Sequence, residues 1–133
     1  MKLLTFIRRR EGMTDEEFEH HWLHVHGELV RSHIDAIRCK RYVQTHVAHP
    51  AVFSAMNAPR GGDESVAEPY DGVAELWWES AEEFLACLES PEGKAAWAEI
   101  AADEPNFVNY KTTYNFIGEE VLISQSPDWK APS

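Results

Sequence analysis

The chain has 133 residues, which is enough for one domain with a single hydrophobic core. Hydrophobic residues make up 44% and charged residues 26%, a composition typical of a soluble globular protein and not of a disordered one. The 12 basic and 23 acidic residues give a net charge of −11, which disfavours nucleic acids and anionic membranes as partners. The two cysteines lack metal-ligand spacing, and no signal-peptide or membrane-spanning pattern is present. We therefore expect a cytoplasmic protein without a nucleic-acid or membrane partner.

The elements predicted along the chain have the order βαββαβ. Residues 2–9 are typical of a strand, and Thr14, followed by acids up to Glu17, is an N-cap for a helix that we expect to end near Ile37. Further strands are predicted over residues 39–49, 72–79 and 114–123, and Ser80 and Ser90 each precede a helix. These elements form one domain over residues 1–123, and residues 124–133 are predicted to be a C-terminal tail.

Residues 49–70 have no clear periodicity and are predicted to be an inserted loop. The segment contains three prolines and the pair Gly61-Gly62, and it is longer than most connections in a compact domain. We expect it to act as a lid over a pocket, with Val52, Phe53 and Met56 directed toward a ligand.

The third predicted strand carries large apolar residues on both faces. Val73 and Trp77 alternate with Leu76 and Trp78, so each face of the sheet needs a cover. The helices of so short a chain cover one face only, and a second copy is expected to cover the other. The sequence therefore predicts a homodimer.

Several segments resemble the EthD-like family, in order along the chain. EEFEHHWLHVHGELV at residues 16–30 resembles the family's first helix through Phe18, Trp22, the pair His26-Gly27 and Leu29. RYVQTH at 41–46, YDGVAELWWES at 70–80 and SPEG at 90–93 resemble later parts of the family pattern. The resemblance implies an α+β, ferredoxin-like fold: a four-stranded antiparallel sheet with helices on one face, which dimerises into an α+β barrel. It also implies a pocket between the sheet and the helices.

The resemblance leaves the chemistry open. The family is named for a protein that accompanies an ether-degrading oxygenase system, and fungal relatives look like dehydratases or decarboxylases of aromatic polyketides. The wider superfamily includes polyketide cyclases, muconolactone isomerases, cofactor-free oxygenases and haem enzymes, and a fold does not choose among them. Our first hypothesis is a cofactor-independent lyase or isomerase that acts on an aromatic or polyketide-like molecule. The alternatives are a non-catalytic accessory protein that binds a hydrophobic intermediate for a partner oxygenase, and a cofactor-free oxygenase.

Histidines are the candidate catalytic residues, because six of the seven lie between His20 and His46. His26 and His33 flank the apolar stripe predicted for the first helix, which consists of Phe18, Trp22, Val25 and Leu29, and His21 lies on the opposite flank. His46 shares a strand face with Tyr42 and Gln44. If that face meets the helix, His26, His46 and Tyr42 line one pocket. One histidine would be the general base, and the other histidine or Tyr42 would stabilise the developing oxyanion. The alternative is that these histidines have structural or solvent-exposed positions only.

Glu75 is the remaining candidate for a catalytic role. We expect it to share a face with His46, where it could orient a histidine or hold a proton. The alternative is a salt bridge to Arg38, Lys40 or Arg41, or a dimer contact. The residues predicted to bind the substrate are Trp22, His33, Phe53, Met56 and Trp77.

No cofactor is expected. His20 and His24 have the spacing of metal ligands on a helix, but they lie away from the apolar stripe and no third ligand is evident. The sequence has no dinucleotide loop, P-loop or nucleophile elbow. His26 or His46 could ligate a haem, but the first-helix motif resembles the EthD-like group and not the haem groups.

Overall fold

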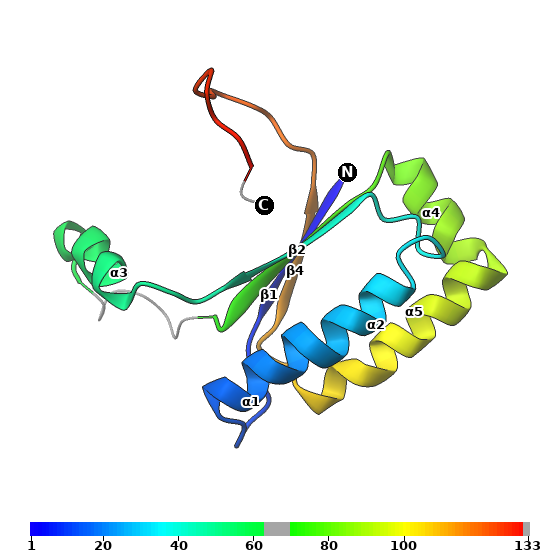
Figure 1. Cartoon of the computed structure of the whole chain (residues 1–133), viewed down its shortest axis with the longest axis horizontal. Helices are drawn as coiled ribbons and strands as arrows, with labels where there is room; N and C mark the ends of the chain where they lie inside the picture. The colour runs from blue at the N-terminus through cyan, green and yellow to red at the C-terminus, as the bar shows by residue number, and fades with distance from the viewer. Residues whose placement is uncertain (63–69, 132–133) are drawn as a thin grey trace.

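The computed structural model describes residues 1–62 and 70–131. They form one antiparallel sheet of four strands in the order β2-β3-β1-β4, with helices packed on one face (Figure 1). The strands are β1 (Lys2–Ile7), β2 (Arg41–His46), β3 (Gly72–Trp77) and β4 (Tyr114–Gly118). Each lies within its predicted range and is shorter at one or both ends. The predicted α+β, ferredoxin-like fold is confirmed.

The first helical segment contains a change of helix type. The Thr14 hydroxyl accepts a hydrogen bond from the Glu17 N–H at 3.1 Å and so caps α1 (Asp15–His20), as predicted. A π-helical stretch, η1 (His21–His26), follows, and then α2 (Gly27–Ser32). The helix ends before the predicted boundary at Ile37, because residues 33–38 form turns.

The π-helical turn changes which residues face the sheet. The Gly27 N–H bonds to the Trp22 carbonyl, five residues earlier instead of four. Each residue after Trp22 therefore lies about where the preceding residue would lie in a regular α-helix. As a result His26 and Val30 are buried, whereas Val25 is 44% exposed. The predicted apolar stripe is wrong at Val25 because it assumed α-helical periodicity throughout.

Two helices follow β3 and complete the layer above the sheet. α4 (Ala81–Glu89) and α5 (Pro91–Asp103) begin at Ser80 and Ser90, whose hydroxyls accept hydrogen bonds from the N–H groups of Glu83 and Gly93. A 3₁₀ turn, η4 (Glu104–Asn106), continues α5. The core lies between these helices and the sheet, and its largest fully buried side chains are Trp22, Phe18, Phe107, Ile37 and Cys87.

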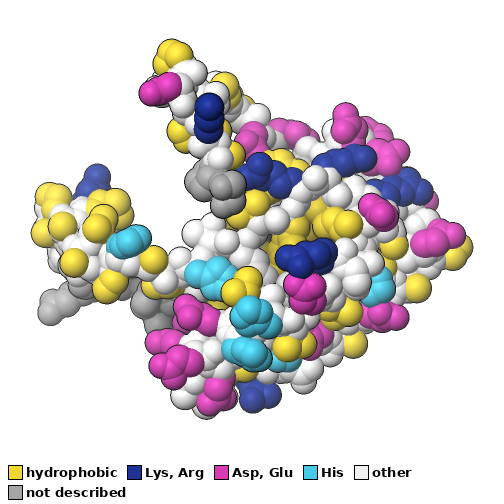
Figure 2. Space-filling model, in the orientation of Figure 1, with side chains coloured by type: hydrophobic (Ala, Val, Ile, Leu, Met, Phe, Trp, Pro, Cys, Tyr) yellow, Lys and Arg dark blue, Asp and Glu magenta, His cyan; other side chains and the backbone are white. Residues whose placement is uncertain are grey.

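The segment predicted to be a loop contains helical structure. α3 (Pro50–Asn57), with proline in its first turn, is followed by the 3₁₀ turn η2 (Ala58–Arg60). Figure 1 shows α3 standing apart from the sheet and from the other helices. Val52, Phe53 and Met56 are exposed on it, and Figure 2 shows the apolar character of this helix. The remainder of the predicted lid, residues 63–69, lies outside the described residues.

The sheet face opposite the helices carries large apolar side chains. Phe6, Val73 and Phe116 lie on this open face, because their neighbours along each strand face the helices. Trp77 also lies there, with the Lys2 Nζ 4.5 Å from its ring centroid. The expected two-sided apolar sheet is confirmed, and its cover by a second copy stays a prediction. Within residues 1–62 and 70–131, no helix combines the length and hydropathy needed to cross a bilayer.

Candidate functional site

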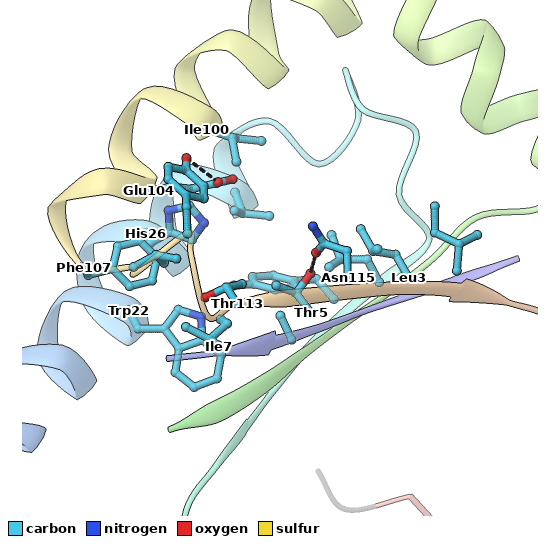
Figure 3. A pocket seen from close by; sticks show the side chains of 17 residues that line it. Leu3, Thr5, Ile7, Trp22, His26, Ile100, Glu104, Phe107, Thr113 and Asn115 are labelled. Carbon is cyan, nitrogen blue, oxygen red and sulfur yellow. Dashed lines mark hydrogen bonds between the residues drawn. The ribbon is translucent and has the colours of Figure 1, made fainter. Parts of the chain in front are cut away.

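A cavity of about 380 Å³ lies between the helices and the sheet (Figure 3). Apolar side chains, including Trp22 and Phe107, form most of its wall. The polar side chains that line it come from β1, η1, β2, η4, β4 and the chain before β4, and they are Thr5, His26, Tyr42, Glu104, Tyr110, Thr113 and Asn115. The cavity occupies the place that the family resemblance implies.

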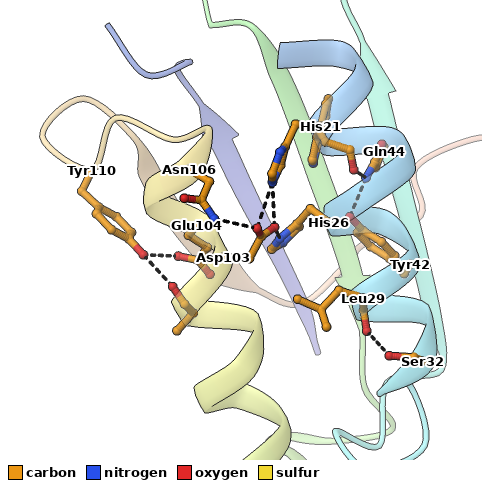
Figure 4. A network of polar contacts seen from close by, with 12 residues as sticks. His21, His26, Leu29, Ser32, Tyr42, Gln44, Asp103, Glu104, Asn106 and Tyr110 are labelled. Carbon is orange, nitrogen blue, oxygen red and sulfur yellow. Dashed lines mark hydrogen bonds and ion pairs between the residues drawn. The ribbon is translucent and has the colours of Figure 1, made fainter. Parts of the chain in front are cut away.

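His26 is held at the cavity by an aspartate of another helix. Its Nδ1 lies 2.9 Å from Oδ2 of Asp103, at the end of α5 (Figure 4). The His26 ring also packs against Phe107, with 4.7 Å between ring centroids. Only 9% of the His26 side chain is exposed, so the ring has one orientation set by both contacts.

Asp103 accepts hydrogen bonds from three side chains. Besides His26, the His21 Nε2 lies 2.9 Å from Oδ1, and the Asn106 amide donates to the same oxygen at 3.0 Å. Burial by itself raises the pKa of Asp103, but the hydrogen bonds from Asn106, His21 and His26 outweigh it and hold this pKa below its ordinary value. The carboxylate is therefore ionised at neutral pH.

These contacts define the protonation of His26. Burial lowers the pKa of His26 below 6.5 and outweighs the opposing hydrogen bond and charge of Asp103. The imidazole is therefore neutral at neutral pH. Because a carboxylate only accepts, Nδ1 must carry the proton and Nε2 the lone pair. Across the described part of the chain no side-chain or backbone group bonds to Nε2, so this nitrogen can accept a proton from a ligand.

Tyr42 is positioned by a second chain of hydrogen bonds, along β2. The Gln44 amide nitrogen donates to the Trp22 carbonyl at 2.9 Å and to the Tyr42 hydroxyl at 2.7 Å. Because the carbonyl only accepts, this contact fixes the orientation of the amide, and Gln44 Oε1 accepts from His46 Nε2–H at 2.8 Å. Burial raises the pKa of the Tyr42 phenol, which stays protonated. With its oxygen accepting from Gln44, Tyr42 can donate its own proton to a ligand.

Gly27 makes room for this chain of hydrogen bonds. A Cβ at position 27 would lie 3.2 Å from the Gln44 amide nitrogen and 3.2 Å from the Trp22 carbonyl oxygen. A larger residue would crowd the hydrogen bond between them. The pair His26-Gly27 thus places the imidazole at the cavity and leaves space for the Gln44 amide that bonds to the Tyr42 hydroxyl.

The structure brings together some of the predicted site residues. His26, Tyr42 and Trp22 line the cavity. His46 lies on the same sheet face but lines a neighbouring cavity of about 480 Å³ with Tyr42 and Gln44, where its ring packs 4.4 Å from that of Trp22. Burial lowers the pKa of His46. Its contact with the candidate site is indirect, through Gln44.

Glu75 does not share a face with His46. β2 and β3 pair as expected, but the register places Glu75 opposite Val43 and His46 opposite Gly72. Since alternate residues of a strand face opposite sides, Glu75 lies on the open face of the sheet. Its Oε1 lies 3.1 Å from Lys2 Nζ. The predicted shared face is therefore wrong. Glu75 forms a salt bridge, as the alternative supposed, but its partner is Lys2 and not Arg38, Lys40 or Arg41.

Four predicted substrate-binding residues lie away from the cavity. His33 Nε2 lies 2.6 Å from Glu99 Oε2, and Trp77 donates its indole N–H to Glu120 on the open face. Phe53 and Met56 are exposed on α3, which stands apart from the sheet and the other helices (Figure 1), and neither is among the residues that line the cavity. His33 was expected beside the apolar stripe of a regular helix, and Phe53 and Met56 were expected on a lid, but the fold directs these side chains, like that of Trp77, away from the cavity.

The outer face of the first helical segment carries His20 and His24. Their ring centroids lie 5.1 Å apart, and Figure 2 shows histidines gathered there beside acidic side chains. The described ranges contain no cluster of three or more His, Cys, Asp or Glu side chains able to hold a metal ion.

Sequence reasoning missed Asp103, Glu104 and Tyr110. One indication was the position of Asp103 in the last turn of a helix, where the helix dipole disfavours a negative charge unless cationic or donor groups compensate it. Nothing local identified His26 and His21 as those groups, because they lie 77 and 82 residues earlier in the chain.

The fold and the cavity define a ferredoxin-like α+β protein with a polar cluster beneath its helices. Residues 10–110 match the family model of the EthD domain. Since this match covers most of the chain, the protein belongs to the EthD family. Among curated protein sequences no significant match was found.

Solved structures agree with this assignment of the fold. An EthD family protein from Bacillus halodurans is 19% identical, with a TM-score of 0.58 over 90% of this chain and 97% of its own. The protein At3g17210 from Arabidopsis thaliana is 15% identical, with a TM-score of 0.56 over 93% of this chain and 98% of its own. An EthD-like protein from Ralstonia eutropha is 19% identical, with a TM-score of 0.56 over 94% of each chain. At these identities the likeness concerns the fold, and the reaction must be inferred from the site.

Proposed function

We propose that this protein is a cofactor-independent lyase or isomerase that moves a proton on an aromatic or polyketide-like carbonyl compound. The observation that carries the proposal is His26, which lines an apolar cavity while Asp103 holds its Nδ1 at 2.9 Å. Apolar walls with a few polar groups suit a flat hydrophobic ligand. Dehydration and cyclisation of such compounds both begin with removal of a proton next to a carbonyl group.

In the proposed reaction, His26 Nε2 takes a proton from the carbon beside the carbonyl group. The electron pair of the broken C–H bond forms a C=C bond to the carbonyl carbon, and the C=O π pair moves to the oxygen, which gives an enolate. Asp103 stabilises the imidazolium that results, because its carboxylate already accepts the Nδ1 proton. The imidazolium then returns the proton, either to another carbon in an isomerisation or to a departing hydroxyl group, which leaves as water.

Tyr42 is the proposed donor to the enolate oxygen. Its phenol lines the same cavity as His26, and its own oxygen is held by Gln44. A preorganised donor is most valuable where charge develops and water is excluded. In this scheme His46 and Gln44 are positioning residues, because they act on the ligand only through Tyr42.

The test is exchange of the α-protons of 2-tetralone, an aromatic ketone, in deuterated buffer, followed by proton NMR. We expect the wild-type protein to accelerate exchange and His26→Ala to reduce this acceleration by a factor of about 10²–10⁴. His24→Ala is the matched control, because His24 lies on the same helical segment with an exposed side chain, and it should exchange at the wild-type rate. Equal rates for wild type and His26→Ala would refute His26 as the base.

The accessory-protein hypothesis predicts a different pattern in the same experiment. The apolar wall around Trp22 and Phe107 would also suit a carrier of a hydrophobic intermediate. A carrier would bind 2-tetralone, measured by calorimetry, without accelerating exchange above buffer. An enzyme would retain binding in His26→Ala while losing exchange.

A further inference from the structure

The charged side chains that line the cavity have one sign. Among the lining residues that the structure describes, no Lys or Arg is present, and Glu104 is the acidic one. Asp103 does not line the cavity but bonds to the His26 ring, so two consecutive carboxylates lie near His26 (Figure 4). His26, neutral at neutral pH, does not offset them.

Glu104 is held in place by a hydrogen bond. The Tyr110 hydroxyl donates to Glu104 Oε2 at 2.7 Å (Figure 4). Burial, the hydrogen bond to Glu104 and the charge of Glu104 raise the pKa of Tyr110 to about 12. Tyr110 therefore remains a neutral donor that orients the carboxylate. The negative charge of Glu104 also acts on His26, whose pKa it raises against the effect of burial.

A ligand carboxylate would have no compensating charge in this cavity. It would lose part of its hydration on entry and meet the like charge of Glu104. The chain does place cations nearby, but Arg31, Lys40 and Arg41 line the neighbouring cavity on the β2 side. The other polar groups around His26, namely Thr5, Tyr42, Thr113 and Asn115, are neutral and can bond to carbonyl or hydroxyl oxygens.

We propose that the cavity binds an uncharged carbonyl compound in preference to a carboxylate, and that Glu104 sets this preference. The inference rests on the proposed function and narrows it. Dehydration or cyclisation of a neutral ketone fits the cavity, whereas decarboxylation of a free acid does not.

The test compares two naphthalene ligands of similar shape by isothermal titration calorimetry at neutral pH and low salt. The ketone 2-acetylnaphthalene is uncharged, and 2-naphthoate carries a carboxylate. We expect the ketone to bind on the order of tenfold more tightly, a size consistent with one unit charge acting over several ångströms in a partly hydrated site. Added salt should reduce the difference.

Variants of Glu104 test whether this residue causes the preference for the ketone over 2-naphthoate. Glu104→Gln should bring the affinity for 2-naphthoate to within about threefold of that for the ketone, by removing the Coulomb repulsion. Glu99→Gln is the matched control, because Glu99 is on α5 and bonds to His33 outside the cavity, and it should keep the wild-type difference. Circular dichroism melting confirms that each variant is folded, and Glu104→Ala provides a second variant without the charge.

Three results would overturn the proposal: no binding of the ketone, equal or tighter binding of 2-naphthoate by the wild type, or an undiminished difference in both Glu104 variants. Its failure is separable from failure of the proposed function. Selective binding of the ketone without α-proton exchange would refute the catalytic role of His26 alone. Exchange dependent on His26, combined with equal binding of both ligands, would refute the charge preference alone.

Discussion

Replacing Asp103 by asparagine tests whether one carboxylate organises the site. The wild-type carboxylate accepts hydrogen bonds from His26, His21 and Asn106. Asparagine has a similar shape but only one accepting oxygen, so its NH₂ group must face at least one of these donors. A hydrogen bond to a charged group contributes about 1.5–3 kcal/mol and a neutral one about 0.5–1.5 kcal/mol. Losing one such bond and weakening the others should therefore lower the free energy of unfolding by about 2–4 kcal/mol.

Urea unfolding followed by circular dichroism measures this change. Glu99→Gln is the control for removing a carboxylate from the same helix. Glu99 bonds to a single histidine, His33, and its side chain is 63% exposed. We expect that variant to change the free energy of unfolding by less than about 1 kcal/mol.

The replacement Asp103→Asn also has a predicted effect on catalysis. The hydrogen bond and charge of Asp103 raise the pKa of His26 against burial, so Asp103→Asn should move the histidine limb of the pH–rate profile to lower pH. The rate of 2-tetralone exchange should fall by about 10²–10⁴, because the Nδ1 proton loses its charged acceptor. If Asp103→Asn is as stable and as active as the wild type, the proposed role of Asp103 in organising the site is wrong.

Three further predictions concern stability and assembly. The free energy of unfolding, measured in urea titrations, should decrease as the pH falls from about 7.5 to 5.5. Folding lowers the pKa of His26 and of His46, so the unfolded chain binds more protons in this range, and His26→Gln should weaken the dependence. Gly72→Ala should lower the free energy of unfolding by about 1–3 kcal/mol, because the new Cβ would lie 2.3 Å from the Trp22 ring, and an unchanged melting temperature would contradict that packing. Light scattering at micromolar concentration should give about twice 15.2 kDa, and Phe116→Lys on the open sheet face should reduce the mass to that of one chain; a wild-type monomer would contradict the expected homodimer.

Helix starts and strand positions could be predicted because they depend on residues close together in the chain. Thr14, Ser80 and Ser90 each cap a helix by bonding to a backbone N–H three residues later. Such local patterns predict where an element begins. They do not predict a change of helix type, and the π-helical turn after His20 altered the buried face from Val25 to His26.

The error at Glu75 has a different physical origin. The pairing of β2 with β3 follows from the fold, but the face of each residue depends on the register. A difference of one residue moves every side chain to the other side of the sheet. Glu75 thus lies beside Lys2 on the open face, whereas Gln44 joins His46 to Tyr42 on the helix face.

Local patterns were sufficient for the order of the strands and of the helices packed on the sheet, though not for α3. They also predicted the two-sided apolar sheet and the candidacy of His26 and Tyr42, because capping, strand alternation and a family motif depend on neighbouring residues. The partners that give these residues their chemistry became evident only in the folded chain. Asp103 reaches His26 across 77 residues of sequence, and Gln44 reaches the Trp22 carbonyl from a different element. Such contacts depend on how the helices pack on the sheet, and burial in that packing is also what lowers the pKa of His26 and leaves its Nε2 able to act as a base.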